Sequence, residues 1–116
     1  ALSLQNDLVT SGGDVDMTTF NGLLQTTAGS DVNAFGGAGS TAVRLESLGG
    51  SADLTALGAV YGGIGGTRLA AGNHLTIGGT LLAAGGLITL ASDTNLSGVG
   101  NLAINTSVTA ITSAEL

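Results

Sequence analysis

Several residue types that commonly stabilise or equip small proteins are missing from this chain of 116 residues. It contains no cysteine, no proline, no lysine and no tryptophan. The lack of cysteine excludes a disulfide framework and a thiolate metal site. The lack of lysine excludes the phosphate loop G-x-x-x-x-G-K-[ST], and the G-x-G-x-x-G phrase of dinucleotide-binding proteins is also absent.

Aromatic side chains are scarce, being limited to Phe20, Phe35 and Tyr61. Hydrophobic residues nevertheless make up 43% of the chain, most of them leucine and alanine. A core without bulky rings suits a narrow interior between short strands better than a wide sandwich anchored by tryptophan or tyrosine.

Positive charge is almost absent. Arg44 and Arg68 are the only fixed cations against eight acidic residues, and the net charge is −6. This balance argues against nucleic acid as a partner and against anionic lipid headgroups. The longest apolar stretch, residues 81–91, is too short to span a bilayer. We therefore expect neither a nucleic-acid complex nor insertion into a membrane.

Glycine, in contrast, is abundant, with 21 residues and recurrent Gly-Gly pairs. Each glycine inside a helix costs about 1 kcal/mol relative to alanine, so long helices are not expected.

A short phrase recurs within residues 69–104. Two large aliphatic residues stand two positions apart, beginning at Leu75, Ile88 and Leu102, so that the intervals are 13 and 14 residues. This is the strand period, in which alternate side chains share one face. Each phrase follows a glycine, where a turning backbone can adopt positive φ without a steric penalty. The three turn glycines are Gly72, Gly85 and Gly100.

Strand, glycine turn and strand at near-constant spacing predict an all-β fold, a small parallel β-solenoid. Looser copies of the phrase begin near residues 2, 15, 32, 43 and 54, and the region 58–66 is a candidate for an extra strand. With two strands per coil we expect about four or five coils in a single domain or fragment, residues 1–116, most regular over 69–112. The architectural alternative is a β-sandwich subunit completed by donor-strand exchange, with the N-terminal strand as the donated piece.

The phrases AGNHLTIGGTLLAAGGLITLAS and SDTNLSGVGNLAINTSVTAI resemble the repeats of filamentous-haemagglutinin-type adhesins and autotransporter passenger domains. The resemblance covers residues 69–112 and implies a right-handed parallel β-helix from a large secreted bacterial protein that works in adhesion and surface assembly. It implies no catalytic residues.

Both ends of the predicted solenoid are expected to be adhesive. Residues 1–10 and 102–111 each alternate as a strand would, and no proline, lysine or capping helix protects them. Neighbouring coils of a longer polypeptide or copies of the same chain would cover these ends, and the second arrangement gives an open filament.

Few residues are candidates for chemistry. His74 is the only histidine, and it precedes an aliphatic pair where a solvated surface residue is the simplest interpretation. Asp14 and Asp16, in GGDVDM, are weak calcium candidates, because the third glycine of the G-G-x-G-x-D unit is missing and the unit does not repeat. Acidic residues for glycoside cleavage are present, but the aromatic platforms that hold sugars are too few. We expect no enzyme activity and no cofactor.

The sequence thus predicts an extracellular, cell-surface structural protein, either a self-assembling filament or sheath subunit or a repeat module of an adhesin. The alternative is a module that binds carbohydrate or a host surface through a flat Thr/Ser/Asn face. The residues expected to pack and assemble the solenoid are Leu2, Leu4, Leu75, Ile77, Ile88, Leu90, Leu102 and Ile104, with Gly72, Gly85 and Gly100 at the turns.

Overall fold

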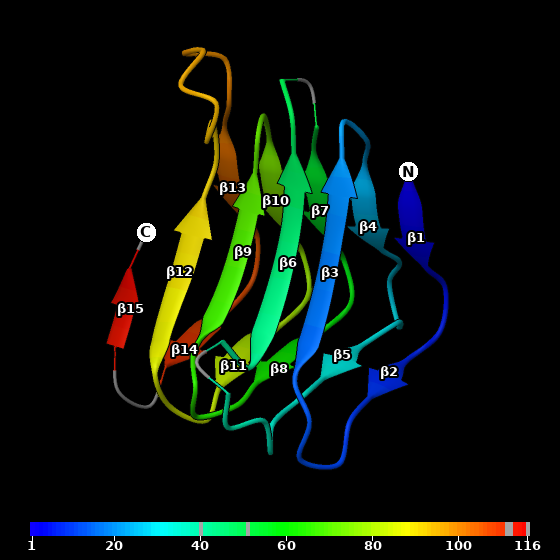
Figure 1. The fold of residues 1–116 in the computed structure, drawn as a ribbon, viewed down its shortest axis with the longest axis vertical. Coiled ribbons are helices and arrows are strands. Elements are labelled where there is room, and N and C mark those ends of the chain that lie inside the picture. Colours follow the sequence, from blue (N-terminus) through cyan, green and yellow to red (C-terminus); the bar gives the residue numbers. More distant parts are fainter. Residues whose placement is uncertain (40, 51, 111–112, 116) are drawn as a thin grey trace.

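The computed structural model describes residues 1–39, 41–50, 52–110 and 113–115, the last of these as backbone. Fifteen short strands and no helix occur in these segments. The strands form three parallel sheets of five strands each, wound into a solenoid (Figure 1). The predicted fold class is confirmed. The β-sandwich alternative is wrong, because the strands pair only in parallel within the described part of the chain.

The chain visits the three sheets in turn, and each sheet takes every third strand. Sheet 1 contains β1 (Leu2–Leu4), β4 (Leu24–Thr26), β7 (Leu54–Ala56), β10 (Leu75–Ile77) and β13 (Leu102–Ile104). Sheet 2 contains β2 (Leu8–Val9), β5 (Val32–Asn33), β8 (Val60–Gly62), β11 (Leu81–Ala83) and β14 (Val108–Ala110). Sheet 3 contains β3 (Val15–Phe20), β6 (Val43–Leu48), β9 (Thr67–Ala71), β12 (Leu87–Ala91) and β15 (Ser113–Glu115).

One coil therefore consists of three strands, where the sequence predicted two. Leu75 pairs with Leu54 on one side and with Leu102 on the other, so successive coils repeat after 21 and 27 residues. The predicted interval from Leu75 to Ile88 joins strands of different sheets, since Ile88 lies on β12 of sheet 3. The chain makes about four turns between β1 and β13, in agreement with the predicted four or five coils.

The sequence predicted sheet 2 only in part. A copy of the phrase near residue 32 corresponds to β5, but β2, β11 and β14 were not predicted as separate strands. Strands of two or three residues display little alternation. In β11 the outward residue is Leu82, so the apolar run hides which side chains face inward. The expected extra strand in region 58–66 is present as β8. The end of the regular repeat, residues 111 and 112, lies outside the described residues.

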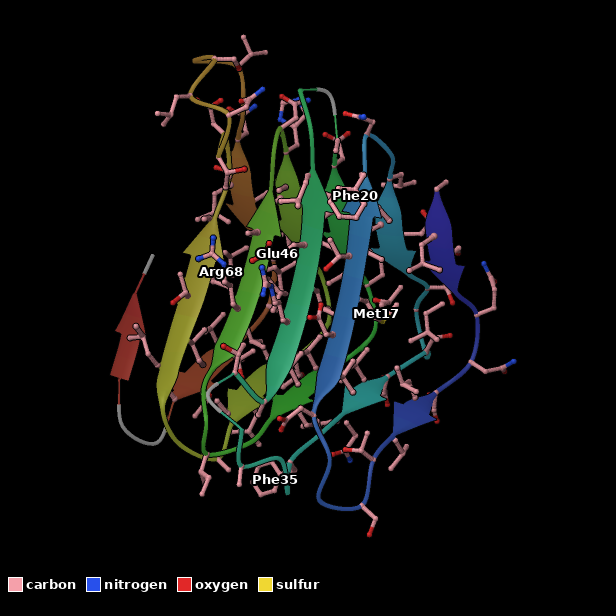
Figure 2. The ribbon with its side chains drawn as sticks, in the orientation of Figure 1. Met17, Phe20, Phe35, Glu46 and Arg68 are labelled. Carbon is pink, nitrogen blue, oxygen red and sulfur yellow. The ribbon has the colours of Figure 1, made fainter. Side chains whose placement is uncertain are left out.

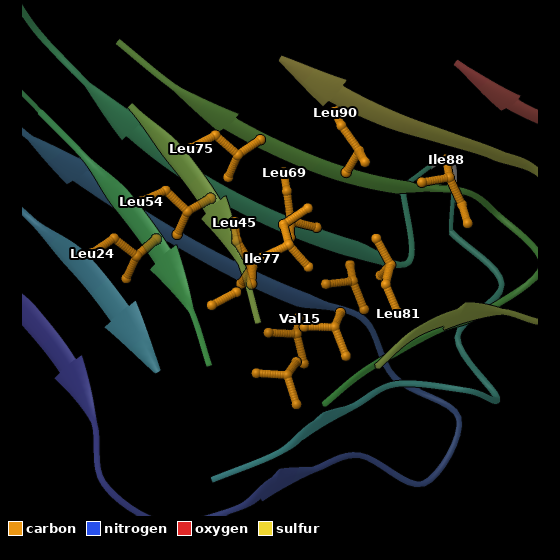
Figure 3. Packing of buried hydrophobic residues seen from close by; sticks show 14 of the residues in the cluster. Val15, Leu24, Leu45, Leu54, Leu69, Leu75, Ile77, Leu81, Ile88 and Leu90 are labelled. Atoms are coloured by element: carbon orange, nitrogen blue, oxygen red, sulfur yellow. The ribbon is translucent and has the colours of Figure 1, made fainter. Parts of the chain in front are cut away.

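The core is a narrow column of stacked aliphatic side chains (Figure 3). In sheet 1 the inward positions form a ladder of five leucines, one from each coil: Leu2, Leu24, Leu54, Leu75 and Leu102. The predicted packing residues of the interior coils are almost completely buried: Leu75, Ile77, Ile88 and Leu90. Stacking like residues at equivalent positions lets each side chain contact its counterparts above and below, and no aromatic ring is needed to fill the interior.

Glycine serves two different purposes at the corners. Positive φ occurs at glycines other than the three predicted ones, namely at Gly12, Gly29, Gly49, Gly66, Gly86 and Gly98. The expectation of positive φ at Gly72, Gly85 and Gly100 is therefore wrong. Gly72 and Gly100 are needed for close stacking instead, because a Cβ on Gly72 would lie 2.0 Å from the Gly49 carbonyl oxygen and one on Gly100 2.5 Å from the Asn73 oxygen. Gly85 is under neither constraint, since the nearest atom would be 3.5 Å away.

Candidate functional site

The N-terminal end of the solenoid exposes part of the core. Strands β1, β2 and β3 are each the outermost strand of their sheet and pair on one side only, within the part of the chain that the structure describes (Figure 1). Leu2 is 40% exposed. Leu4, Leu8 and Met17 are partly buried and pack against the core from its end. This end combines free backbone edges with half-covered inward aliphatics.

The C-terminal end has the same character. Strands β13, β14 and β15 are outermost at this end, and Leu102, Ile104, Val108 and Ala110 are only partly buried against the core. The sequence predicted Leu102 and Ile104 here, and Met17 at the other end as the inward partner of Val15, but it did not single out Val108, Ala110 or Leu8. Each of these residues pairs with an inward aliphatic residue of the adjacent coil. That pairing can be recognised only when the three-strand repeat is known.

A second feature of the stack is a set of corner side chains that accept backbone hydrogen bonds from the following coil. Asp7 Oδ1 accepts from the Asp31 N–H at 2.8 Å, and Asp31 Oδ1 accepts from the Ala59 N–H at 2.9 Å. At another corner Asp53 Oδ1 accepts from the His74 N–H at 3.0 Å. In each case the acceptor lies in one coil and the donor in the next toward the C-terminus, so the corner bonds give the solenoid a polarity.

His74 belongs to this corner system. Its Nδ1 accepts a hydrogen bond from the Asn101 N–H at 3.0 Å. The imidazole thus accepts a backbone N–H of the next coil, as the Asp53 carboxylate does one coil earlier. Asp53 Oδ1 contacts the backbone N–H of His74 and the side chain of Asn73, which orients the turn and not the imidazole. The sequence interpretation of His74 as a solvated surface residue is wrong in part, since the residue is half-buried and bonded.

A shallow hollow of about 380 Å³ opens beside His74 on the outer face of sheet 1. Its lining is polar except for one alanine: Asp53, Thr55, His74, Thr76, Asn101 and Ala103. The threonines occupy outward positions on adjacent strands in direct register. Hydroxyl, carboxylate and amide groups in such a row can hydrogen-bond a polyhydroxylated ligand.

Sheet 3 carries a charged cluster on its outer face (Figure 2). Glu46 on β6 is 4% exposed, and its Oε1 contacts Arg44 Nε at 3.2 Å and Arg68 Nε at 2.5 Å. Burial by itself raises the pKa of Glu46, but hydrogen bonds from Arg68 and Arg44 and their positive charges outweigh it, so the pKa lies below its usual value. The two arginines of the chain thus hold one carboxylate and add a charged contact between β6 and β9.

This cluster predicts a specific pH dependence of stability. The pKa of Glu46 is lower in the folded chain than in the unfolded chain, so its ionised form stabilises the fold above the unfolded value of about 4.3. That contribution is lost as the pH falls through the folded pKa. We expect Glu46→Gln to lower the free energy of unfolding by about 1–2 kcal/mol at pH 7, with the deficit shrinking toward pH 3, in urea titrations at several pH values. Asp16→Asn is the comparison, because Asp16 is an exposed carboxylate opposite Arg44 on the adjacent strand β3 and its removal breaks no bond of Glu46. An equal deficit for Glu46→Gln at pH 7 and pH 3 would refute the assignment.

The two weak calcium candidates accept hydrogen bonds from different residues. Asp14 Oδ1 accepts from the Gly39 N–H at 3.2 Å, whereas Asp16 Oδ1 accepts from the Thr18 hydroxyl at 2.9 Å. Among the described residues no group of three or more histidine, cysteine, aspartate or glutamate side chains is placed to hold a metal ion.

The longest loop of the C-terminal half, between β12 and β13, projects from the stack (Figure 1). Asp93 organises it, since its carboxylate accepts from the Ser97 N–H and hydroxyl and from the Gly98 N–H. Leu96 has a positive φ of 56° and is 88% exposed. A single exposed leucine has no periodic signal, so the amino-acid pattern predicted no role for this loop.

Comparison with known proteins found no relative of this chain. No family model matches the chain, and no match was found among curated proteins or solved structures. In the described segments there is also no helix with the length and hydrophobicity needed to cross a membrane. The open ends, the corner bonds and the outer faces are therefore the features from which a function must be argued.

Proposed function

We propose that this protein is a structural module of an extracellular bacterial filament, sheath or surface adhesin, and that it acts by extending its solenoid end to end. In this proposal it has no catalytic activity and no cofactor, and its partners are copies of itself or neighbouring coils. The observation that carries the proposal is the condition of the two end coils. Among the described residues, each end coil leaves one edge of three strands unpaired and leaves inward aliphatic side chains half-covered, for example Leu2 and Leu102.

The physical argument is that such ends attract further strands. A free strand edge presents unpaired N–H and C=O groups, which pair readily with another chain. Covering the half-exposed aliphatics would add about 25 cal/mol for each Å² of apolar area removed from water. Association of unlike ends does not close on itself, so copies joined in this way form a filament.

The first test is negative-stain electron microscopy of the purified chain over a range of concentrations. We expect filaments of uniform width that lengthen as the concentration rises. Discrete small particles at every concentration would refute self-assembly as the function.

A charge placed on an end should abolish assembly without unfolding the chain. Ile104 faces inward on β13 and is partly buried, so Ile104→Lys would set an ammonium group where the next coil must pack. The matched control is Thr109→Lys, which makes the same change in net charge at an exposed position of the same coil. We expect filaments from Thr109→Lys and monomers from Ile104→Lys, with both variants retaining the circular dichroism of the wild-type chain. Filaments from both would refute the role of the end coil.

A second candidate function is recognition of surface carbohydrate, supported by the polar hollow beside His74 and the aligned threonines Thr55 and Thr76. A double change of these threonines to alanine would then abolish binding to immobilised glycans while filament formation persists. If no glycan binds the wild-type chain, this candidate fails.

A further inference from the structure

The two ends of the solenoid are complementary, and the internal coils show how they would fit. In sheet 1 the first residue of each strand is an inward leucine, and it pairs with the leucine of the next coil, from Leu2 through to Leu102. In sheet 2 the first residue of each strand is likewise aliphatic and pairs with its counterpart in the next coil, from Leu8 through to Val108. A copy added beyond β13 and β14 would therefore find the same kind of neighbour that each internal coil already has.

The corner hydrogen bonds decide the direction of stacking. In the corner bonds of the described residues the acceptor side chain lies in the earlier coil and the backbone donor in the later one, as in the pairs Asp7 with Asp31 and His74 with Asn101. The residues immediately before the sheet 2 strands occupy one corner of the stack, in the order Asp7, Asp31, Ala59, Thr80 and Ser107. Asp7 and Asp31 accept a backbone N–H from the next coil there, and Ser107 has a hydroxyl oxygen at the same corner of the C-terminal coil. Asn101 has an amide oxygen at another corner, and both residues are exposed. In the N-terminal coil the corresponding backbone donor is the N–H of Asp7, immediately before β2.

We propose that a second copy of this chain stacks head to tail on the C-terminal coil, with β1 of that copy paired in parallel with β13 and β2 paired with β14. Leu2 then lies beside Leu102 and Leu8 beside Val108, and the Ser107 hydroxyl oxygen accepts the N–H of Asp7. This inference rests on the proposed function and adds to it the partner, the polarity and the register. Contact between two like ends would lose the parallel pairing that every described strand of the solenoid has.

The absence of cysteine makes the register directly measurable, because two introduced thiols can react only with each other. Outward positions of sheet 1 are in register from Ser3 through Gln25, Thr55 and Thr76 to Ala103. In the stacked pair Ser3 of one copy is therefore opposite Ala103 of the other. Adjacent strands are about 4.8 Å apart, which is within reach of a disulfide or a short bifunctional thiol reagent.

The experiment compares three full-length variants under conditions in which the wild-type chain assembles. We expect Ser3→Cys/Ala103→Cys to yield, after oxidation or treatment with the reagent, a ladder of covalent dimers, trimers and higher multimers that collapses on reduction. The matched control is Ser3→Cys/Thr109→Cys, whose second thiol is on sheet 2 of the same end coil and should yield no ladder. Ser3→Cys alone should remain monomeric after denaturation.

Each other result has a distinct meaning. A ladder from the control pair would show that the copies are rotated by one sheet, and dimers from Ser3→Cys alone would show contact between like ends. Either would overturn the proposed register and leave the structural function standing. Filaments without any ladder would also overturn it. If none of the variants nor the wild-type chain forms filaments at any concentration, the proposed function itself fails.

Discussion

Replacing Gly72 by alanine is expected to lower the free energy of unfolding by about 3 kcal/mol, because the backbones of two coils approach too closely at this corner to admit a Cβ. The added Cβ would lie 2.0 Å from the Gly49 carbonyl oxygen and 3.0 Å from its carbonyl carbon. Both neighbours are backbone atoms of the adjacent coil, so no side chain can rotate away to make room. The Gly72 N–H also donates to the Ser47 carbonyl oxygen at 2.8 Å, and a displaced corner would weaken that bond. Urea unfolding followed by circular dichroism measures the change.

Gly85→Ala is the matched control. A Cβ at Gly85 would meet only Ile64, at 3.5 Å, which is an ordinary van der Waals contact, and its φ is not in the left-handed region. We expect a change within about 0.5 kcal/mol of the wild-type chain, since alanine restricts the unfolded state slightly more than glycine does. Equal destabilisation by the two substitutions would show that coil stacking is not limited by the contact at Gly72.

The second large effect is expected in the leucine ladder of sheet 1. Leu54 is completely buried at the middle of the stack, between Leu24 and Leu75. Leu54→Ala should destabilise the chain by about 3–4 kcal/mol, through the lost transfer free energy and the cavity left between two coils that are fixed by their strand pairing. Thermal and urea unfolding measure this loss.

The same substitution at the end of the ladder provides the comparison. Leu2 is 40% exposed and has a neighbour on one side only, so Leu2→Ala should cost about 1 kcal/mol or less in the dissociated chain. If head-to-tail stacking occurs, Leu2→Ala should in addition raise the concentration at which filaments appear, because Leu2 is then covered by Leu102 of the next copy. Equal costs for Leu54→Ala and Leu2→Ala in the monomer would contradict the gradient of burial along the stack.

These two predictions reflect how the molecule is stabilised. The described residues form a narrow core, and each interior coil depends on contact with its two neighbours, both through aliphatic ladders and through close backbone approach at the glycine corners. The end coils have one neighbour each and are therefore the least stable part of the chain and the part with most to gain from association. Stability and the proposed assembly rest on the same set of contacts.

The amino-acid sequence by itself determined the fold class. Scarce aromatics, recurrent glycine and aliphatic pairs such as Leu75 with Ile77 were enough to predict a parallel solenoid, because strand period and corner spacing are local properties of the chain. The inward residues Leu75, Ile77, Ile88 and Leu90 could be identified for the same reason, and so could the absence of phosphate-loop and thiolate chemistry.

The tertiary structure decided what stacks on what. The three-strand coil places Leu75 beside Leu102 and assigns Ile88 to another sheet, a register set by pairings between residues 21 to 30 positions apart that no local pattern contains. It also distinguished Gly72 from Gly85, which look alike in the sequence, because only the neighbouring coil determines whether a Cβ fits. The burial of Glu46 between Arg44 and Arg68 and the bond from Asn101 to His74 arise in the same way, from residues brought together by stacking.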